Sequence, residues 1–167
     1  MRVKKEDYEK NGFIILDELG KYKIEDWSLE SNITITIFGK QYNITLIIDE
    51  LKKLEDGWEI PEELIEYVKK FLNGIGSYLE KAMYEIEQYY HTTIKEEAEE
   101  GFCEYVEIKE RNSLNQFLTP YGLYITRSDT LRAIGMIKLV FQCDWYEDEF
   151  MVKYDKDCNI KEVGPLW

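Results

Sequence analysis

The chain has 167 residues, 44% of them apolar and 14% aromatic, which is enough to bury a hydrophobic core in one domain. Its formal net charge of −13 disfavours binding to nucleic acid and to anionic membranes, because both depend on lysine and arginine. We therefore expect a single domain over residues 1–167, with no nucleic-acid or membrane partner, whose charge permits attraction to a basic protein.

The first part of the chain predicts short strands and a β-hairpin. Apolar residues gather at 13–16, and residues 22–27 have the composition of a short strand. Residues 33–37 alternate isoleucine with threonine, and residues 42–48 resume the alternation after a break that contains Gly39. Two alternating runs around a short glycine-containing break are typical of a hairpin with one face on the core.

Residues 61–90 have apolar side chains at helical spacing. Pro61, followed by two glutamates, is typical of a helix start. Gly74 favours a stop or a kink, and the capping-box spacing from Ser77 favours a new start. The pattern predicts either two amphipathic helices or one long helix interrupted near Gly74 and Gly76.

Strand patterns return in the last third of the chain, and the run at 137–145 is predicted to be the longest strand. Short connections between the later runs favour antiparallel pairing. The order of strands, helices and strands predicts an α+β fold, in which the helices lie between an N-terminal hairpin and a C-terminal meander of a mostly antiparallel sheet. The predicted strands cover residues 102–108, 123–126, 137–145, 150–154 and 160–163.

Two acidic segments are candidate partner-binding sites. Residues 144–149 contain four acids and two aromatic residues without a lysine or arginine, and residues 96–100 contain a block of glutamates. Aromatic anchors among acids could bind a basic protein, paired carboxylates could serve a hydrolase or hold a cation, and a charged hairpin tip could simply discourage aggregation. The candidate residues are Asp144, Trp145, Tyr146, Glu147, Asp148, Glu149, Glu96, Glu97, Glu99 and Glu100.

Motifs for catalysis and cofactors do not emerge from the sequence. The only histidine, His91, follows two tyrosines at the end of the helical region, where a structural role is favoured. Residues 155–159 resemble a calcium loop, but the positions that need glycine and glutamate hold Ile160 and Leu166, so a hairpin turn is predicted. Residues 73–77 lack the third glycine of a dinucleotide loop, and no cofactor is predicted.

The three cysteines predict a reducing compartment. Cys103, Cys143 and Cys158 are widely spaced and form no Cys-x-x-C pair, which favours free thiols over a zinc site or disulfides. No apolar run approaches the length of a membrane span, and the charged start of the chain is unlike a signal peptide. We expect a cytoplasmic protein.

The C-terminal part resembles a family of small bacterial proteins known only as a domain of unknown function. The resemblance rests on residues 141–145, which read Phe-Gln-Cys-Asp-Trp, on the acidic turn and strand after them, and on Val163-Gly164-Pro165. Members of that group tend to carry aspartate after the tryptophan and then a Glu-His-Gly turn. This chain has Tyr146 there and neither histidine nor glycine after it, so no residue role is transferred.

The sequence favours a non-enzymatic binding protein of immunity or antitoxin type with a basic partner. The alternative hypothesis is a carboxylate- or cation-dependent hydrolase that uses the 144–149 turn. The sequence leaves the oligomeric state open.

Overall fold

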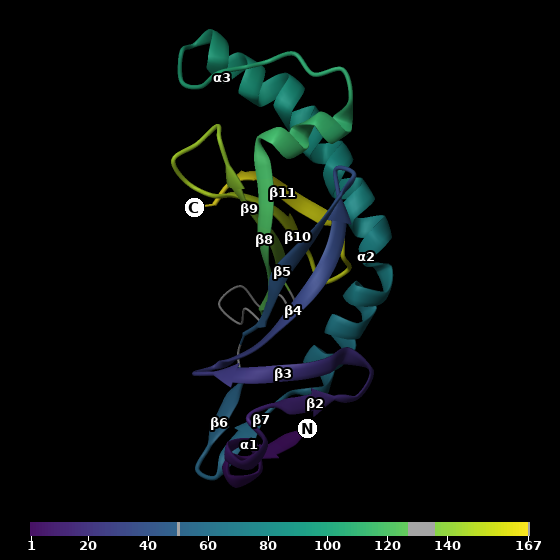
Figure 1. Cartoon of the computed structure of the whole chain (residues 1–167), viewed down its shortest axis with the longest axis vertical. Coiled ribbons are helices and arrows are strands. Elements are labelled where there is room, and N and C mark those ends of the chain that lie inside the picture. Colours follow the sequence, from purple (N-terminus) through teal and green to yellow (C-terminus); the bar gives the residue numbers. More distant parts are fainter. Residues whose placement is uncertain (50, 127–135, 167) are drawn as a thin grey trace.

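A computed structural model describes residues 1–49, 51–126 and 136–166, and it confirms the predicted α+β fold. Among these residues, eight strands form one sheet in the order β11-β10-β9-β8-β5-β4-β3-β2 (Figure 1). Neighbouring strands pair antiparallel except β5 and β8, which pair parallel. The strands are β2 (Ile14–Leu16), β3 (Gly20–Glu25), β4 (Ser28–Ile37), β5 (Lys40–Ile48), β8 (Leu118–Thr126), β9 (Met136–Cys143), β10 (Phe150–Tyr154) and β11 (Ile160–Pro165).

A second, three-stranded antiparallel sheet lies at the end of the molecule that holds the N-terminus (Figure 1). It has the order β1-β7-β6, helix α1 directly follows β1, and the 3-10 turn η1 connects β2 to β3 of the large sheet. Strands of three residues are too short to show a period of two, which is why this sheet was not predicted. The bounds are β1 (Arg2–Lys4), α1 (Lys5–Asn11), η1 (Asp17–Leu19), β6 (Lys52–Leu54) and β7 (Gly57–Glu59).

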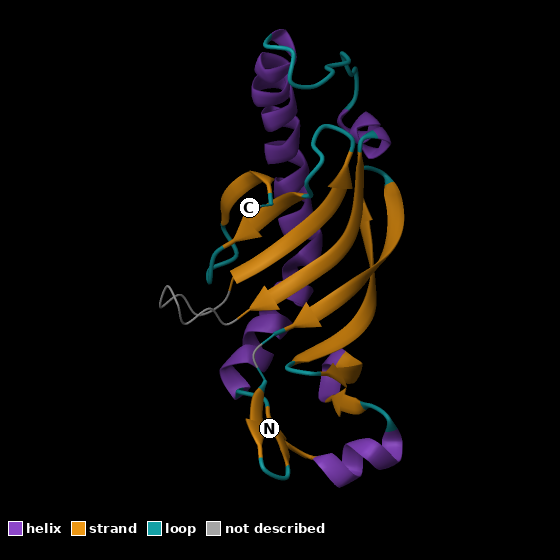
Figure 2. Cartoon of the chain, turned by 90° about the vertical axis from the view of Figure 1, so that its left-hand side faces the viewer, coloured by secondary structure: helices purple, strands orange, loops and turns teal. Residues whose placement is uncertain are grey.

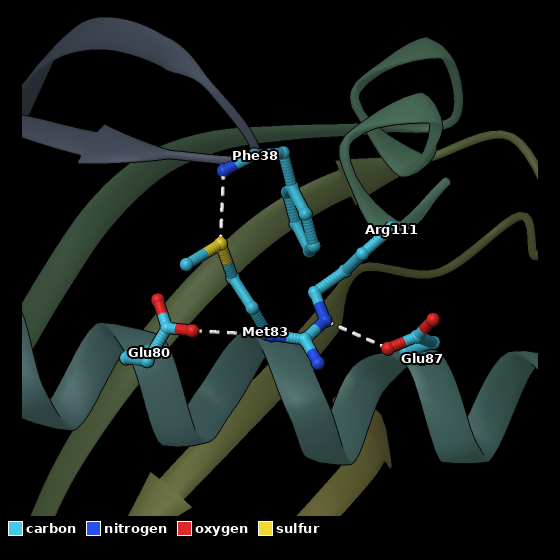
Figure 3. A network of polar contacts seen from close by, with 5 residues as sticks. All are labelled: Phe38, Glu80, Met83, Glu87 and Arg111. Carbon is cyan, nitrogen blue, oxygen red and sulfur yellow. Dashed lines mark hydrogen bonds and ion pairs between the residues drawn. The ribbon is translucent and has the colours of Figure 1, made fainter.

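The predicted hairpin is confirmed as β4 and β5, and their side chains alternate between core and solvent. Phe38 and Gly39 form its turn, and both have a positive φ, of 48° and 74°, as in the tight turns that match the twist of a hairpin. The Phe38 amide donates to the Met83 sulfur at 3.1 Å (Figure 3). The hairpin tip is therefore attached to the long helix.

Helix α2 (Glu62–Tyr89) runs along one face of the sheet and lies behind it in Figure 2. It passes through Gly74 and Gly76 without a break, so the interruption predicted there is wrong. The Tyr78 side chain leans back over Gly74, where an added Cβ would lie 2.6 Å from its ring, and it stacks on Phe71 with the ring centroids 5.1 Å apart. Gly74 therefore makes room for a ring.

The long helix loses its regular pitch only beyond α2. A π-helical turn, η2 (Tyr90–Ile94), leads into α3 (Lys95–Glu99), which lies at the opposite end of the molecule from the N-terminus (Figure 1). One interrupted helix is thus the correct alternative, with its interruption about four turns later than predicted. No helix in the described part of the chain is long and apolar enough to cross a membrane.

The strand predicted at 102–108 is wrong, because these residues form an irregular loop. The strand predicted at 137–145 is confirmed as β9, but with eight residues it is not the longest, since β4 has ten. The predictions at 123–126, 150–154 and 160–163 are confirmed within β8, β10 and β11. The antiparallel meander of β9, β10 and β11 is also confirmed.

Polar contacts attach α2 to the elements around the core. The Tyr154 hydroxyl donates to the Tyr78 carbonyl at 3.0 Å, and the Tyr67 hydroxyl donates to the Asp155 carbonyl at 2.9 Å. On the other side, Arg111 begins the 3-10 helix η3 (Arg111–Gln116) and pairs with two glutamates of α2 (Figure 3). Its Nε lies 2.7 Å from Glu87, and its Nη1 lies 3.2 Å from Glu80.

Candidate functional site

The structure brings the two acidic segments together at the α3 end of the molecule. The Tyr146 hydroxyl, in the 144–149 turn, donates to Glu97 Oε2 at 2.8 Å. The Tyr89 hydroxyl, from the last residue of α2, lies 2.7 Å from that of Tyr146 and serves as its donor, because the Tyr146 proton is already used. This chain of hydrogen bonds joins segments that are 49 residues apart in the sequence.

Tyr146 and Tyr89 are both held in the protonated form that the chain of hydrogen bonds needs. Burial, together with the hydrogen bond that Tyr146 donates to the Glu97 carboxylate, raises the pKa of Tyr146 far above its ordinary value. Burial also raises the pKa of Tyr89. Both hydroxyls therefore remain donors at neutral and moderately alkaline pH.

The candidate residues of the 144–149 turn divide into a buried and an exposed group. The Trp145 side chain is only 7% exposed, because its ring packs against Tyr90, Phe117 and Phe150 with centroid distances of 5.1, 6.0 and 5.5 Å. Trp145 therefore does not have the exposed anchor position that the sequence suggested. The acids Asp144, Glu147 and Asp148 are exposed, and Glu149 is half-buried.

The glutamates of α3 mostly face solvent. Glu96, Glu99 and Glu100 are exposed, and Glu97 is half-buried because it accepts the Tyr146 hydrogen bond. We call the eight acids of the two segments the acidic tip. They are Glu96, Glu97, Glu99, Glu100, Asp144, Glu147, Asp148 and Glu149.

A groove of about 540 Å³ opens beside the acidic tip, between the loop after α3 and the 144–149 turn. Phe102 and Val106, on that loop, are 75% and 54% exposed, so two apolar side chains lie together on the same wall. We call this hollow the aromatic groove. Its lining residues are Gly101, Phe102, Cys103, Glu104, Val106, Phe117, Asp144 and Trp145.

The loop that forms one wall of the aromatic groove is irregular but attached at three points. The Phe102 amide donates to the Glu97 carbonyl at 2.9 Å, and the Cys103 thiol donates to the Ile94 carbonyl at 3.5 Å. The Tyr90 hydroxyl donates to the Val106 carbonyl at 2.7 Å and accepts from the Val106 amide at 3.1 Å. Tyr90 thus takes the place of a neighbouring strand for Val106, which is why this strand-like sequence needs no sheet.

Replacing Tyr90 by phenylalanine is expected to loosen this wall. Tyr90→Phe removes both hydrogen bonds to Val106, each worth about 1 kcal/mol, so the Val106 amide should exchange with solvent about tenfold faster. Amide hydrogen exchange followed by NMR measures the effect. Tyr8→Phe is the matched control, because Tyr8 makes the same pair of bonds with Ile24 at the other end of the molecule. Unchanged Val106 exchange in Tyr90→Phe would contradict the role given to this hydroxyl.

His91 and the 155–159 turn have structural roles in the described contacts. His91 Nδ1 lies 3.1 Å from the Tyr105 hydroxyl. Asp155 Oδ1 accepts hydrogen bonds from the amides of Asp157 and Asn159 at 2.8 and 2.9 Å, which lower the pKa of the Asp155 carboxyl. The predicted hairpin turn at 155–159 is therefore confirmed, and it connects β10 to β11.

No three His, Cys, Asp or Glu side chains lie close enough together to hold a metal ion, as far as the described residues show. Sequence reasoning found both acidic segments but missed Phe102, Glu104 and Phe117 as groove residues. The sequence carried no signal for them, since an exposed aromatic residue looks like a core residue until its neighbours are known.

The comparisons with known proteins assign a family. No curated protein and no solved structure matches the chain. One family model, described as a domain of unknown function (DUF6985), matches residues 18–166, a range that includes the acidic tip and the aromatic groove. The C-terminal residues predicted membership of a family without known function, and the chain belongs to the DUF6985 family.

Proposed function

We propose that the chain is a protein-binding module that docks a basic protein at the acidic tip. The observation that carries this proposal is the Tyr146–Glu97 hydrogen bond, which joins two acidic segments beside an apolar groove. Phe102 and Val106 place exposed apolar surface next to these acids. Exposed apolar side chains within a charged rim are typical of sites where proteins meet.

In this proposal the charge of the acidic tip speeds association, and the aromatic groove slows dissociation. Residues 80–110 contain ten glutamates and three lysines, a net charge of 3 − 10 = −7, and the 144–149 turn adds four acids. Such a field speeds the encounter with a basic protein and weakens with added salt. The groove then supplies the desolvated contacts that slow dissociation.

In its finer form, the proposal is an immunity- or antitoxin-like protein of a bacterial cytoplasm. Toxins that act on nucleic acid are suitable partners, because they need a basic surface to bind phosphate. An acidic protein can cover that surface by matching its charge. The alternative of a hydrolase has less support, because the described contacts of Tyr146 and Cys143 shape the turn and bring no pair of its carboxylates together.

The test compares two variants with equal change in charge. The tip variant replaces three exposed glutamates of the acidic tip by glutamine, and the control variant replaces three exposed glutamates near the N-terminus. Proteins from the source cells that bind the unaltered chain at low salt are identified by mass, and the retained protein is purified. The tip variant carries Glu96→Gln, Glu99→Gln and Glu147→Gln, and the control carries Glu6→Gln, Glu18→Gln and Glu25→Gln.

The expected partner is a basic protein that salt displaces. The tip variant should associate about tenfold more slowly at low salt, with a flatter dependence of rate on salt, whereas the control should bind like the unaltered chain. Stopped-flow mixing measures both rates. Equal association rates for the two variants would refute docking at the acidic tip.

A further inference from the structure

The aromatic groove has a lining that suits a cation. Three aromatic side chains line it: Phe102 is 75% exposed and offers an open ring, whereas Phe117 is half-buried and Trp145 is buried. Two exposed carboxylates, those of Glu104 and Asp144, lie beside them. None of the described residues that line it is a lysine or arginine. Aromatic faces attract cations through the ring quadrupole, and carboxylates accept hydrogen bonds from them.

We propose that the aromatic groove binds the guanidinium side chain of an arginine on the basic partner, so the proposal rests on the proposed function and deepens it. A guanidinium group is planar and weakly hydrated, so it can stack on a ring and bond a carboxylate edge-on at the same time. A lysine ammonium is compact and strongly hydrated, so it gains less from the rings. The groove therefore distinguishes arginine from lysine, which the acidic tip alone would not do.

The groove is already formed before any partner arrives. The Asp144 amide donates to the Phe117 carbonyl at 3.0 Å, which fixes the turn against the start of β8. The opposite wall is attached through Cys103 and Val106, as described above. A preformed site avoids most of the entropy cost of ordering its walls, so even a single side chain can bind measurably.

The experiment titrates single capped amino acids into the ¹⁵N-labelled chain and follows the Trp145 indole and Phe102 amide signals by NMR. Nα-acetyl-arginine amide should shift both signals along a saturable curve in the millimolar range. Nα-acetyl-lysine amide should bind at least about fivefold more weakly. The neutral analogues of these two compounds, which carry citrulline and norleucine in place of arginine and lysine, should leave the signals in place.

Two variants on the same turn localise the arginine. Asp144 lines the groove and Asp148 does not, although both are exposed. Asp144→Asn should weaken the binding of Nα-acetyl-arginine amide about fivefold, because it removes one charge-assisted acceptor. Asp148→Asn changes the net charge equally and should leave the affinity within about twofold.

The outcomes distinguish failure of the arginine site from failure of docking at the acidic tip. Equal shifts from lysine and arginine, equal losses in both variants, or a stronger response to norleucine would overturn the arginine site. Docking at the acidic tip would survive these results, because its test uses Glu96, Glu99 and Glu147, none of which lines the groove. Conversely, arginine could bind the groove while the tip variant associates at the normal rate. That result would refute docking at the acidic tip and support the arginine site.

Discussion

Raising the pH from about 10 to 12 is expected to unfold this protein, because its buried tyrosines resist ionisation in the folded state. Burial raises the pKa of Tyr22 from its ordinary value of 10.0 to about 12, and it also raises those of Tyr67 and Tyr154. In this pH range the unfolded chain releases protons that the folded chain retains. The free energy of unfolding therefore falls by about 1.4 kcal/mol per pH unit for each such tyrosine.

Urea unfolding between pH 8 and 11.5 measures this loss, and the absorbance of tyrosinate reports ionisation. Stability should not change from this source below pH 10, and above it absorbance should rise together with the loss of circular dichroism. Tyr22→Phe should reduce the slope of the free energy of unfolding against pH by the contribution of one tyrosine. Tyr84→Phe, at a side chain that is 50% exposed, should leave this slope unchanged. Gradual ionisation in a chain that stays folded would contradict the prediction.

Truncating Phe150 is expected to destabilise the fold by about 3–5 kcal/mol, because the lost ring leaves a cavity in a packed core. Phe150 is fully buried, and its ring lies 5.4 Å from Tyr89, 5.5 Å from Trp145 and 6.2 Å from Phe141 between ring centroids. Phe150→Ala therefore removes support from two residues of the site as well as from the core. Urea unfolding at neutral pH gives the change in the free energy of unfolding.

The matched control is Phe102→Ala, which removes the same side chain from a position that is 75% exposed. Its stability should stay within about 0.5 kcal/mol of the unaltered chain. A loss below about 1 kcal/mol in Phe150→Ala would mean that the neighbouring rings close the cavity, and the packing described for Trp145 would need revision.

The parts of the fold that the sequence predicted are those with a local pattern. Residues 33–48 alternate over two strands with a glycine between them, and the runs that became β9 and β10 alternate in the same way. Such patterns reflect one buried face, which a single sequence displays directly. The acidic segments were equally visible, because charge is a property of composition.

The wrong predictions concern features that are set by side-chain contacts, and the pattern of apolar and polar residues along the sequence does not show these contacts. Glycine is a poor helix former, so Gly74 predicts a break. The ring of Tyr78, which fills the space above Gly74, is a contact that helix propensity does not describe. Residues 102–108 are predicted as a strand, but the hydroxyl of Tyr90, and not a neighbouring strand, satisfies the Val106 backbone. The groove itself joins residues 101–106 to Asp144, and no local pattern encodes that proximity.

The parallel pairing of β5 with β8 has a consequence for the order of folding. Strands β2 to β5 come from the first third of the chain and β8 to β11 from the last third, and in the described residues the two halves of the sheet pair through β5 and β8 alone. During synthesis the edge of β5 must wait for the last third to leave the ribosome, whereas α2 can already pack on β4. We therefore expect slow folding for a chain of this length, with the half-formed sheet as the species most prone to aggregate.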